Sequence, residues 1–158
     1  MNNVTDLFPE KEPKKEKQIP LEELLESCMH CDFELKSSKI YQRYRICPNC
    51  NYHFSISARR RLATLIDKNS FHETSKWIQS LDPIEFSPRV SYRVRLVQDR
   101  IRTGLNEAII TGTCKIDDKD VVMIVIDSSF LGGSMGVVVG EKVTLALELA
   151  KRKKIPCI

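Results

Sequence analysis

Four cysteines arranged as two Cys-x-x-Cys pairs have the types and spacing to hold a metal ion. Cys28 pairs with Cys31 and Cys47 with Cys50, and the segment 32–46 between the pairs contains four basic residues but no cysteine. Each pair can present two thiolates on a tight turn, so together they can surround one zinc ion tetrahedrally. The spacing is typical of a zinc ribbon. Because a shell of four thiolates leaves no position for water, we expect the ion to be structural.

Other uses of the cysteines fit less well. A redox Cys-x-x-Cys usually occurs once, beside a βαβ pattern. Two disulfides would need an oxidising compartment, and residues 1–10 lack the apolar stretch of a signal peptide. His30 and His53 could each replace a thiolate, but four cysteines already complete the shell. The remaining two cysteines, Cys114 and Cys157, lie in apolar strand-like runs, and we predict that they are packed, inert thiols.

A second possible site is the glycine-rich segment 131–136, which precedes a predicted helix. Gly132, Gly133 and Gly136 would let the backbone approach a ligand, and the N-terminus of the helix would direct N–H groups and a positive dipole toward it. The segment does not fit G-x-G-x-x-G, and it lacks the lysine of a P-loop. Taken alone, the pattern favours a structural turn over a binding site.

Composition sets broad limits on the class of protein. The chain has 158 residues, which suggests one or two domains, and its hydrophobic fraction of 42% is compatible with a globular core. No apolar run approaches the roughly 20 residues of a membrane span. The net charge of +4 permits an anionic partner without requiring one. We therefore expect a soluble protein in a reducing interior, either bacterial cytoplasm or an organelle stroma.

The first half of the chain should be organised around the ribbon. Residues 1–24 are predicted to be a disordered, charged tail. Between the cysteine pairs we expect short antiparallel strands, from the spacing of Phe33, Leu35, Ile40, Tyr41 and Tyr44. A piece this small cannot bury enough surface by itself, so zinc would supply part of its folding free energy.

Two helices and a loop should follow. One helix is predicted over 57–66 with Ser57 as N-cap, and another over 91–102 with Gly104 just past its C-terminus. The segment 71–86 reads as a loop laid across a core, with a turn at its Asp-Pro.

From residue 108 the pattern changes to strand, turn and helix. Runs 108–116 and 121–127 predict a hairpin joined by the polar turn 117–120. A helix over 139–152 and a strand beginning at 155–158 would then complete a βαβ unit with a right-handed crossover. The residues predicted to face inward from that helix are Val143, Leu147 and Ala150.

Four of these segments occur together in one known family. The cysteine ribbon 28–50, the LDPIEF of 81–86, the TGLNEA of 103–108 and the FLGGSMGVVVGEK of 130–142 occur in that order. This order resembles the β subunit of the bacterial or plastid acetyl-coenzyme A carboxylase carboxyltransferase, from about residue 27 to the end. The ribbon is shared by many zinc proteins, whereas its combination with GGSMG-x-VVGEK is far more specific. The DPIEF stretch is closest to plastid-encoded members, which implies the chloroplast stroma, with bacterial cytoplasm as the alternative.

The resemblance implies a domain plan for an α/β protein. After the tail at 1–24, the zinc ribbon would occupy 25–56. Residues 57–158 would form the first part of a crotonase-like (ClpP/crotonase) domain, as in the N-terminal part of a β subunit.

The resemblance also implies a reaction and its partners. Carboxybiotin on the biotin carboxyl carrier protein would give its carboxyl group to acetyl-CoA, yielding malonyl-CoA for fatty acid synthesis. The chain would work with a carboxyltransferase α subunit in an α₂β₂ assembly and with biotin carboxylase, where the complex binds ATP. Backbone N–H groups would stabilise an enolate oxygen, and the biotin ring would take the acetyl proton. On this reading Gly132, Gly133 and Gly136 shape the backbone beside the substrate cleft, and the ribbon caps the cleft or contacts a partner.

The chain departs from the family pattern at three places. Asp127-Ser128-Ser129-Phe130 stands where the family has Asp-Phe-x-Phe, and Asp118-Lys119 replaces a glycine usual in the hairpin turn. The sequence also ends at Ile158, before the second glycine-rich loop that supplies an oxyanion-hole donor in the family. The catalytic residues are therefore expected beyond Ile158, and we expect this polypeptide alone to be inactive, as a fragment, a truncated product or half of a split subunit.

Two other functions remain open from the sequence. A nucleic-acid-binding zinc ribbon would use tyrosines and arginines for stacking and phosphate contact, and its affinity would fall steeply with salt. The residues concerned are Tyr41, Arg43, Tyr44, Arg45, Tyr52 and the Arg59, Arg60, Arg61 cluster. A non-catalytic scaffold could instead dock on a partner through an exposed sheet edge.

Overall fold

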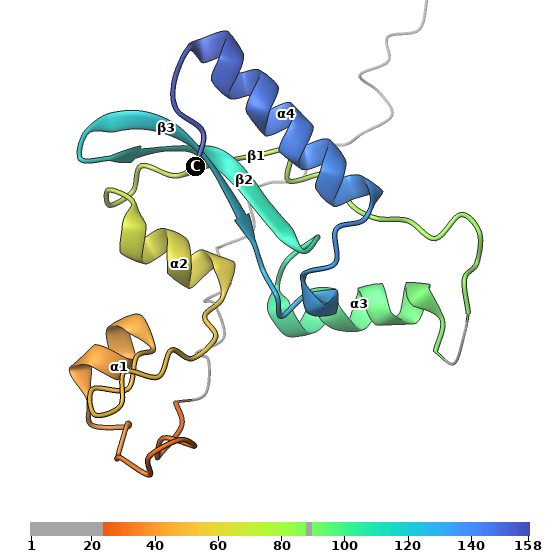
Figure 1. Ribbon diagram of the computed structural model, residues 1–158. Helices are drawn as coiled ribbons and strands as arrows, with labels where there is room; N and C mark the ends of the chain where they lie inside the picture. The colour runs from red at the N-terminus through yellow and green to blue at the C-terminus, as the bar shows by residue number, and fades with distance from the viewer. Residues whose placement is uncertain (1–23, 88–89) are drawn as a thin grey trace, which may run out of the picture.

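A zinc-ribbon-like unit and an α/β unit lie next to each other in the computed structural model, which describes residues 24–87 and 90–158 (Figure 1). Nearly all of the predicted disordered tail lies outside the described residues. The elements in chain order are α1 (Lys39–Tyr44), α2 (Ala58–Leu65), β1 (His72–Thr74), α3 (Tyr92–Thr103), β2 (Ile109–Ile116), β3 (Lys119–Ile126), the 3₁₀ turn η2 (Leu131–Gly133) and α4 (Val137–Lys153).

The segment between the cysteine pairs forms a helix, so the prediction of strands there is wrong. Ser38 begins α1, because its hydroxyl accepts a hydrogen bond from the Tyr41 N–H at 3.3 Å. The helix then turns Tyr41 into the ribbon, where it is 1% exposed. Antiparallel pairing in the ribbon is reduced to single bridges, Ser27 with Glu34 and Ile46 with His53.

The ribbon has a small core of its own. Cys28, Leu35, Tyr41 and Cys47 are buried together, and Phe54 packs against them. Arg45 Nη1 donates a hydrogen bond of 2.8 Å to the Tyr41 hydroxyl. A core this small leaves a large share of the folding free energy to a bound metal.

The second unit is built on a three-stranded antiparallel sheet in the order β1-β2-β3. The predicted hairpin is confirmed, but its turn is shorter than expected, because Lys119 already pairs with Ile116. Asp117 and Asp118 form the turn with φ of 49° and 61°, a left-handed conformation that aspartate tolerates. The carboxylate of Asp67 accepts hydrogen bonds from both of their N–H groups, at 3.1 and 2.8 Å, which fixes the turn.

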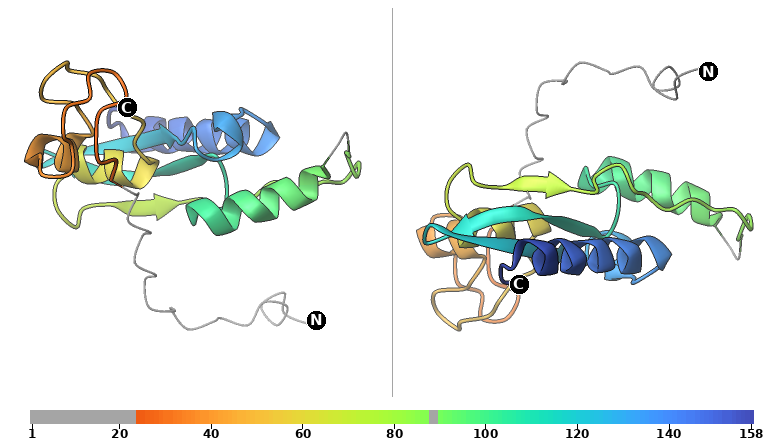
Figure 2. Two further views of the ribbon diagram at one scale, coloured as in Figure 1. Left: turned by 90° about the horizontal axis from the view of Figure 1, so that it is seen from below. Right: turned by 90° about the horizontal axis from the view of Figure 1, so that it is seen from above.

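The two faces of the sheet are covered by different helices. Alternate residues of a strand point to opposite faces, and β3 follows this rule. Val122 packs against Ala146 and Ala150 of α4. The neighbouring residues Val121 and Met123 belong instead to the main core with Ala58 and Leu62 of α2, Leu96 of α3 and Phe130. Figure 2 shows α4 and α3 on opposite sides of the hairpin.

The predicted helix ends agree with the structure. Ser57 caps α2 by accepting from the N–H of Arg60, and α3 ends at Gly104 with φ of 69°. Of the residues predicted to face inward from α4, Ala150 is buried and Val143 packs against the main core, but the prediction for Leu147 is wrong. Leu147 is 51% exposed, because the small side chains of Ala146 and Ala150 are the ones that pack against β3. Lys142 of the same helix is buried.

Only the start of the segment 71–86 packs on the core, through Phe71 and the strand β1, so the expectation of a loop laid across a core is wrong for the rest. Trp77, Leu81 and Ile84 are between 76% and 81% exposed. The loop is held instead by Glu107, whose carboxylate accepts from the N–H and the hydroxyl of Ser80 at 3.0 and 2.5 Å. The side chains of Trp77, Leu81 and Ile84 therefore form part of the outer surface of the described chain.

The end of the chain pairs with β3 in parallel, as the βαβ pattern predicted. The N–H of Val122 donates to the carbonyl of Pro156, and the N–H of Ile158 to the carbonyl of Val122, at 2.8 and 2.9 Å. The helix α4 is the crossover between these two strands. Among the described helices, none has the length and apolar character needed to cross a membrane.

Candidate metal centre and substrate cavity

The four predicted metal ligands lie together. The Sγ atoms of Cys28 and Cys50 are 3.8 Å apart, those of Cys31 and Cys47 are 3.6 Å apart, and all four lie within 4.8 Å of one another. Zinc–sulfur bonds of about 2.3 Å in a tetrahedron place the sulfurs about 3.8 Å from each other. The sulfur cluster therefore has the size that one tetrahedral zinc ion requires.

Both cysteine pairs are presented by the same kind of turn. In the first, the N–H of Asp32 donates to the carbonyl of Cys28 at 2.8 Å; in the second, the N–H of Asn51 donates to the carbonyl of Cys47 at 2.9 Å. Asp32 and Asn51 have φ of 55° and 59°, and Asp and Asn are the residues that most readily adopt this left-handed conformation after glycine. The residue directly after each pair therefore helps to aim its thiolates inward.

The electrostatics of the cluster favour a cation at its centre. A hydrogen bond from Asn49, followed by one from the Phe33 N–H, lowers the pKa of the Cys31 thiol to about 6. The N–H of Tyr52 lowers the pKa of Cys50, but burial and the other three thiols outweigh it and raise that pKa to about 12. Four thiols this close cannot all ionise easily without a compensating charge, and a divalent metal ion supplies it.

The two histidines stand apart from the metal ligands, as predicted. The His30 ring stacks on Tyr52, with ring centroids 5.6 Å apart. The group of potential ligand atoms that the described residues bring together consists of the four cysteines.

The remaining two thiols are packed rather than reactive. Cys114 is 3% exposed in the core, and Cys157 is half-buried beside β3. Burial raises the pKa of both thiols, and the charge of Asp67 adds to the effect at Cys114. A raised pKa leaves little thiolate at neutral pH, which makes both poor nucleophiles.

The predicted glycine turn leads from β3 into α4. Three successive residues, Leu131, Gly132 and Gly133, have φ of 46°, 70° and 74°. A Cβ on Gly133 would come within 3.3 Å of the Ser128 Cα as well as meeting an unfavourable φ, so glycine is required there. Gly136 is the N-cap of α4, and its carbonyl accepts from the N–H of Gly140 at 3.0 Å.

Two of the three predicted glycines line a cavity. Gly132 and Gly133 line a space of about 330 Å³ together with residues 54–56, which belong to the linker between the ribbon and α2. Gly136 lies outside this lining. The residues around the cavity are Phe54, Ser55, Ile56, Ala58, Arg61, Val125, Ile126, Ser128, Gly132 and Gly133.

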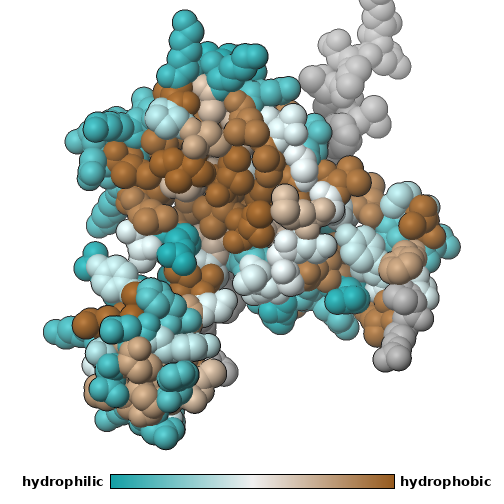
Figure 3. Space-filling model, in the orientation of Figure 1, coloured by the Kyte–Doolittle hydropathy of each residue, from teal (hydrophilic) through white to brown (hydrophobic). Residues whose placement is uncertain are grey.

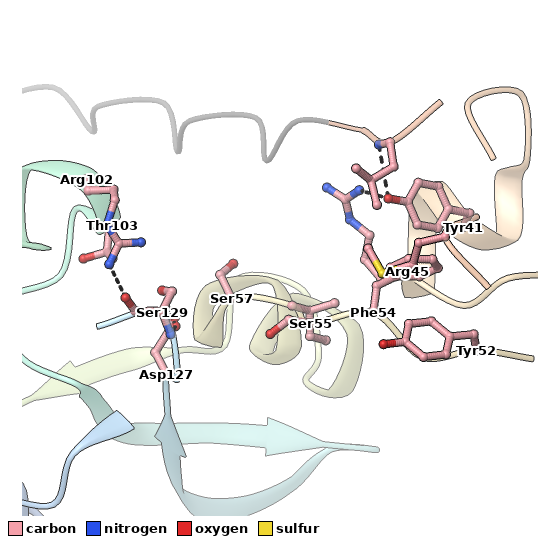
Figure 4. A pocket seen from close by; sticks show the side chains of 13 residues that line it. Tyr41, Arg45, Tyr52, Phe54, Ser55, Ser57, Arg102, Thr103, Asp127 and Ser129 are labelled. Carbon is pink, nitrogen blue, oxygen red and sulfur yellow. Dashed lines mark hydrogen bonds between the residues drawn. The ribbon is translucent and has the colours of Figure 1, made fainter. Parts of the chain in front are cut away.

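A larger cavity of about 580 Å³ lies between the ribbon and the α/β unit (Figure 4). Figure 4 shows Tyr41, Arg45 and Tyr52 of the ribbon on one side, and Arg102 and Ser129 on the other. The full lining is Leu25, Met29, Tyr41, Arg45, Tyr52, Phe54, Ser55, Ile56, Ser57, Arg102, Thr103, Asp127 and Ser129.

Asp127, which lines this cavity, connects it to the start of α2. Its carboxylate is 2% exposed and accepts from the N–H of Ala58, at the start of α2, at 2.7 Å, and from the N–H of Ser129 at 2.9 Å. In the sequence, Asp127 stands out only as part of an altered family motif. Its partner lies 69 residues away in the chain, so local pattern gave no signal of this role.

Comparison with solved structures defines the fold class. The chain superposes on transcarboxylase 12S with a TM-score of 0.51 and 23% identity, covering 65% of this chain and 18% of that one. It superposes on a single-chain, multi-domain long-chain acyl-CoA carboxylase with a TM-score of 0.50 and 22% identity, covering 66% and 10%. The α/β unit therefore has the crotonase-like fold of carboxyltransferases.

Comparison with curated proteins identifies the family. The chain is 39% identical over 144 residues to the acetyl-coenzyme A carboxylase carboxyl transferase subunit beta of Carboxydothermus hydrogenoformans, covering 91% of this chain and 50% of that protein. It is 38% identical over 148 residues to the subunit of the same name from Citrifermentans bemidjiense, covering 94% and 52%. No family model matches. The predicted family is confirmed: the chain is a relative of these β subunits, and it spans about half of their length.

Proposed function

We propose that this chain forms part of a carboxyltransferase β subunit that moves the carboxyl group of carboxybiotin, held on a carrier protein, to acetyl-CoA to give malonyl-CoA. The observation that supports this most is the 39% identity to a named β subunit over 91% of the chain. The alternative of a nucleic-acid-binding ribbon is not favoured by the comparisons.

The part played by the described residues is to position the substrate and to exclude water from it. Removal of a proton from the acetyl methyl group places negative charge on the thioester oxygen. The left-handed backbone at Gly132 and Gly133 lets a thioester approach the main chain, and the positive end of the α4 dipole lies directly after it. We assign no side chain of this chain as the base, because in our proposal the acetyl proton leaves with the biotin ring.

The role proposed for zinc is structural. Cys28, Cys31, Cys47 and Cys50 would hold one ion, which supplies folding free energy and no open coordination position. A rigid ribbon keeps Tyr41, Arg45 and Tyr52 in place as one wall of the larger cavity.

Partners are proposed from the family and from the surface. We propose a carboxyltransferase α subunit in an α₂β₂ assembly, together with the biotin carboxyl carrier protein and biotin carboxylase. An apolar area over β3 and α4 is visible in Figure 3. Ile126 of β3, Leu147 of α4 and the last residue, Ile158, are between 43% and 58% exposed, and exposed apolar side chains of this kind offer surface for such contacts. The plastid stroma is the proposed location, with bacterial cytoplasm as the alternative.

A chimera tests the proposed reaction. Residues 27–158 would replace the matching half of the Carboxydothermus hydrogenoformans β subunit, and formation of malonyl-CoA would be measured with the α subunit, carboxylated carrier and acetyl-CoA. We expect turnover from the chimera and none from the chain alone with the same additions. A chimera that binds zinc and assembles with the α subunit, yet transfers no carboxyl group, would refute the proposal.

A further inference from the structure

The helix α3 and the loop that precedes it expose apolar side chains to solvent. Six of these side chains are between 45% and 81% exposed: Trp77, Leu81 and Ile84 of the loop, and Val94, Val97 and Ile101 of α3. The three from α3 share one face of the helix, because they follow one another at positions i, i+3 and i+7. Exposed apolar side chains that gather in one place mark a surface that binds something.

The loop is fastened to the helix near both of its ends, so the two form one surface. Toward the end of α3, Arg100 Nη2 donates to the carbonyl of Ser80 at 2.7 Å. At its start, the N–H of Tyr92 donates to the carbonyl of Phe86 at 2.9 Å. Figure 1 shows the loop and α3 projecting together from the sheet. We call residues 76–86 and α3 the α3 surface.

The α3 surface carries unpaired positive charge. The helix contains four arginines and one aspartate. That aspartate, Asp99, is already paired with Arg102. Arg93 and Arg95 are exposed, and neither forms a salt bridge with a described residue. Two copies of this surface packed against each other would bring like charges together, so an acidic occupant fits it better than a second copy of the chain.

The start of the chain supplies a segment of that chemistry. Residues 4–10 read VTDLFPE, with three apolar side chains, two acidic groups and no basic one. The next residues, 11–17, read KEPKKEK, with four lysines, two glutamates and no apolar side chain apart from a proline. Apolar and acidic groups are therefore concentrated in the segment that comes first.

The described chain begins close enough to α3 for this segment to reach it. Leu25 lines the larger cavity together with Arg102 and Thr103, the last two residues of α3. Residues 11–24 can span up to about 45 Å when extended. The 12 residues of α3 have a length of only about 18 Å. The segment 4–10 can therefore reach any part of the α3 surface while the ribbon stays where it is.

We propose that residues 4–10 dock on the α3 surface of the same chain, with Leu7 and Phe8 against its apolar side chains and Asp6 and Glu10 beside its arginines. The docked segment covers apolar surface that the rest of the described chain leaves in water. This contact does not depend on the proposed reaction.

Trp77 provides a direct reading of the contact, because it is the only tryptophan of the chain and belongs to the α3 surface. In the full zinc-loaded chain, its fluorescence would be compared with that of a variant combining Leu7→Ser and Phe8→Ser. A tethered segment acts at an effective concentration of about a millimolar, so we expect acrylamide to quench Trp77 about twofold more efficiently in the variant. Its emission should also move to longer wavelength. Ile19→Ser, a similar loss of apolar surface elsewhere in the tail, should change neither quantity.

A substitution on the other side of the contact should have the same effect. Ile101→Asp should expose Trp77 as much as the tail variant does, and combining the two should add nothing further, because both remove one interaction. Ile101 is 78% exposed in the described structure, so the fold should tolerate the change. Leu147→Asp, at an exposed position of α4, is the control and should leave Trp77 unchanged.

A peptide of residues 1–12 completes the test. Added to the tail variant, it should restore the emission and the slow quenching of the unmutated chain, and it should have no effect on the Ile101→Asp variant. Equal quenching in the unmutated chain and the tail variant would overturn the proposal, because the α3 surface would then be free of the tail. Protection of Trp77 that grows with the concentration of the unmutated chain would also overturn it, in favour of contact between two copies.

Discussion

The carboxylate of Asp99 in α3 accepts a hydrogen bond of 2.8 Å from the backbone N–H of Leu131, the residue directly before the two glycines. The same carboxylate pairs with Arg102, which also donates to the carbonyl of Ser129. Burial alone would raise the pKa of Asp99, but the hydrogen bonds from Arg102 and Leu131 and the nearby charges of Arg102 and Arg95 hold it below its ordinary value of 3.8. The end of α3 therefore holds the glycine turn through a charged group.

Asp99→Ala should loosen the glycine turn while leaving the sheet intact. Leu131 has φ of 46°, which is unfavourable for leucine and persists only where the surroundings enforce it. Loss of a hydrogen bond to a charged group costs about 1.5–3 kcal/mol, so amide hydrogen exchange over residues 129–133 should become roughly tenfold to a hundredfold faster. Peptides from β2 and β3 should be unchanged.

Asp82→Ala is the matched control for Asp99. The Asp82 carboxylate accepts from the N–H of Phe86 at 3.0 Å in an exposed loop. Removal of the Asp82 carboxylate should leave the rate of amide hydrogen exchange over residues 129–133 unchanged. Equal exchange rates in Asp99→Ala and the unmutated protein would show that the turn holds its shape without α3.

Cys47→Ser should remove the metal and unfold the ribbon. Cys47 is fully buried at the centre of the ribbon core, and its Sγ lies 3.6 Å from that of Cys31. A structural zinc site contributes directly to folding, so zinc measured by mass spectrometry should fall from one ion per chain to none. Cys114→Ser should keep one ion, because Cys114 lies in the other core. Retention of one zinc ion per chain in Cys47→Ser would contradict the assigned ligand set.

Two glycine substitutions should change stability in opposite directions. A Cβ on Gly112 in β2 would lie 2.5 Å from the backbone carbonyl oxygen of His72 and 2.7 Å from the ring of Phe71. Gly112→Ala should therefore lower the free energy of unfolding by about 1–3 kcal/mol, the usual cost of overpacking. Gly140→Ala should raise it by up to about 1 kcal/mol, because Gly140 lies inside α4 with no atom near the added Cβ. Urea unfolding measures the free energy of unfolding of both variants. If both substitutions changed it in the same direction, the space around each glycine would not determine the effect.

Local signals were sufficient for the features that depend on a few neighbouring residues. The cysteine spacing predicted the four-sulfur cluster, and Ser57 and Gly104 predicted one start and one end of a helix. The βαβ order was also predictable, because the change from a strand pattern to a helical one is visible in the sequence. Each of these features has its physical cause within a few residues of the position that shows it.

Features that depend on distant parts of the chain were not predictable in the same way. Asp127 and Ala58 are 69 residues apart, and Asp99 and Leu131 are 32 apart, so their hydrogen bonds leave no periodic trace. The apolar loop around Trp77 looked like a core element, because sequence shows hydrophobicity and not whether a covering surface is present. In α4, the helical spacing correctly placed Ala150 inward but also predicted an inward Leu147, whereas the structure packs the small side chain of Ala146 against β3.

Lys142 should make stability depend on pH in the alkaline range. Its side chain is 2% exposed, and burial lowers its pKa below 10.5 although the charges of Glu73 and Glu107 oppose the shift. Between the lowered pKa and 10.5 the unfolded chain binds more protons than the folded one, so the free energy of unfolding rises with pH over that interval.

Lys142→Met should remove this rise and increase stability at pH 7, because it replaces a poorly solvated charge by an apolar side chain of similar length. Urea unfolding at a series of pH values between 7 and about 10.5 measures both effects. Lys151→Met, on the exposed last turn of α4, is the control and should keep the pH profile of the unmutated protein. If Lys142→Met is less stable than the unmutated protein at pH 7, the attraction of Glu73 and Glu107 outweighs the cost of burying the ammonium group.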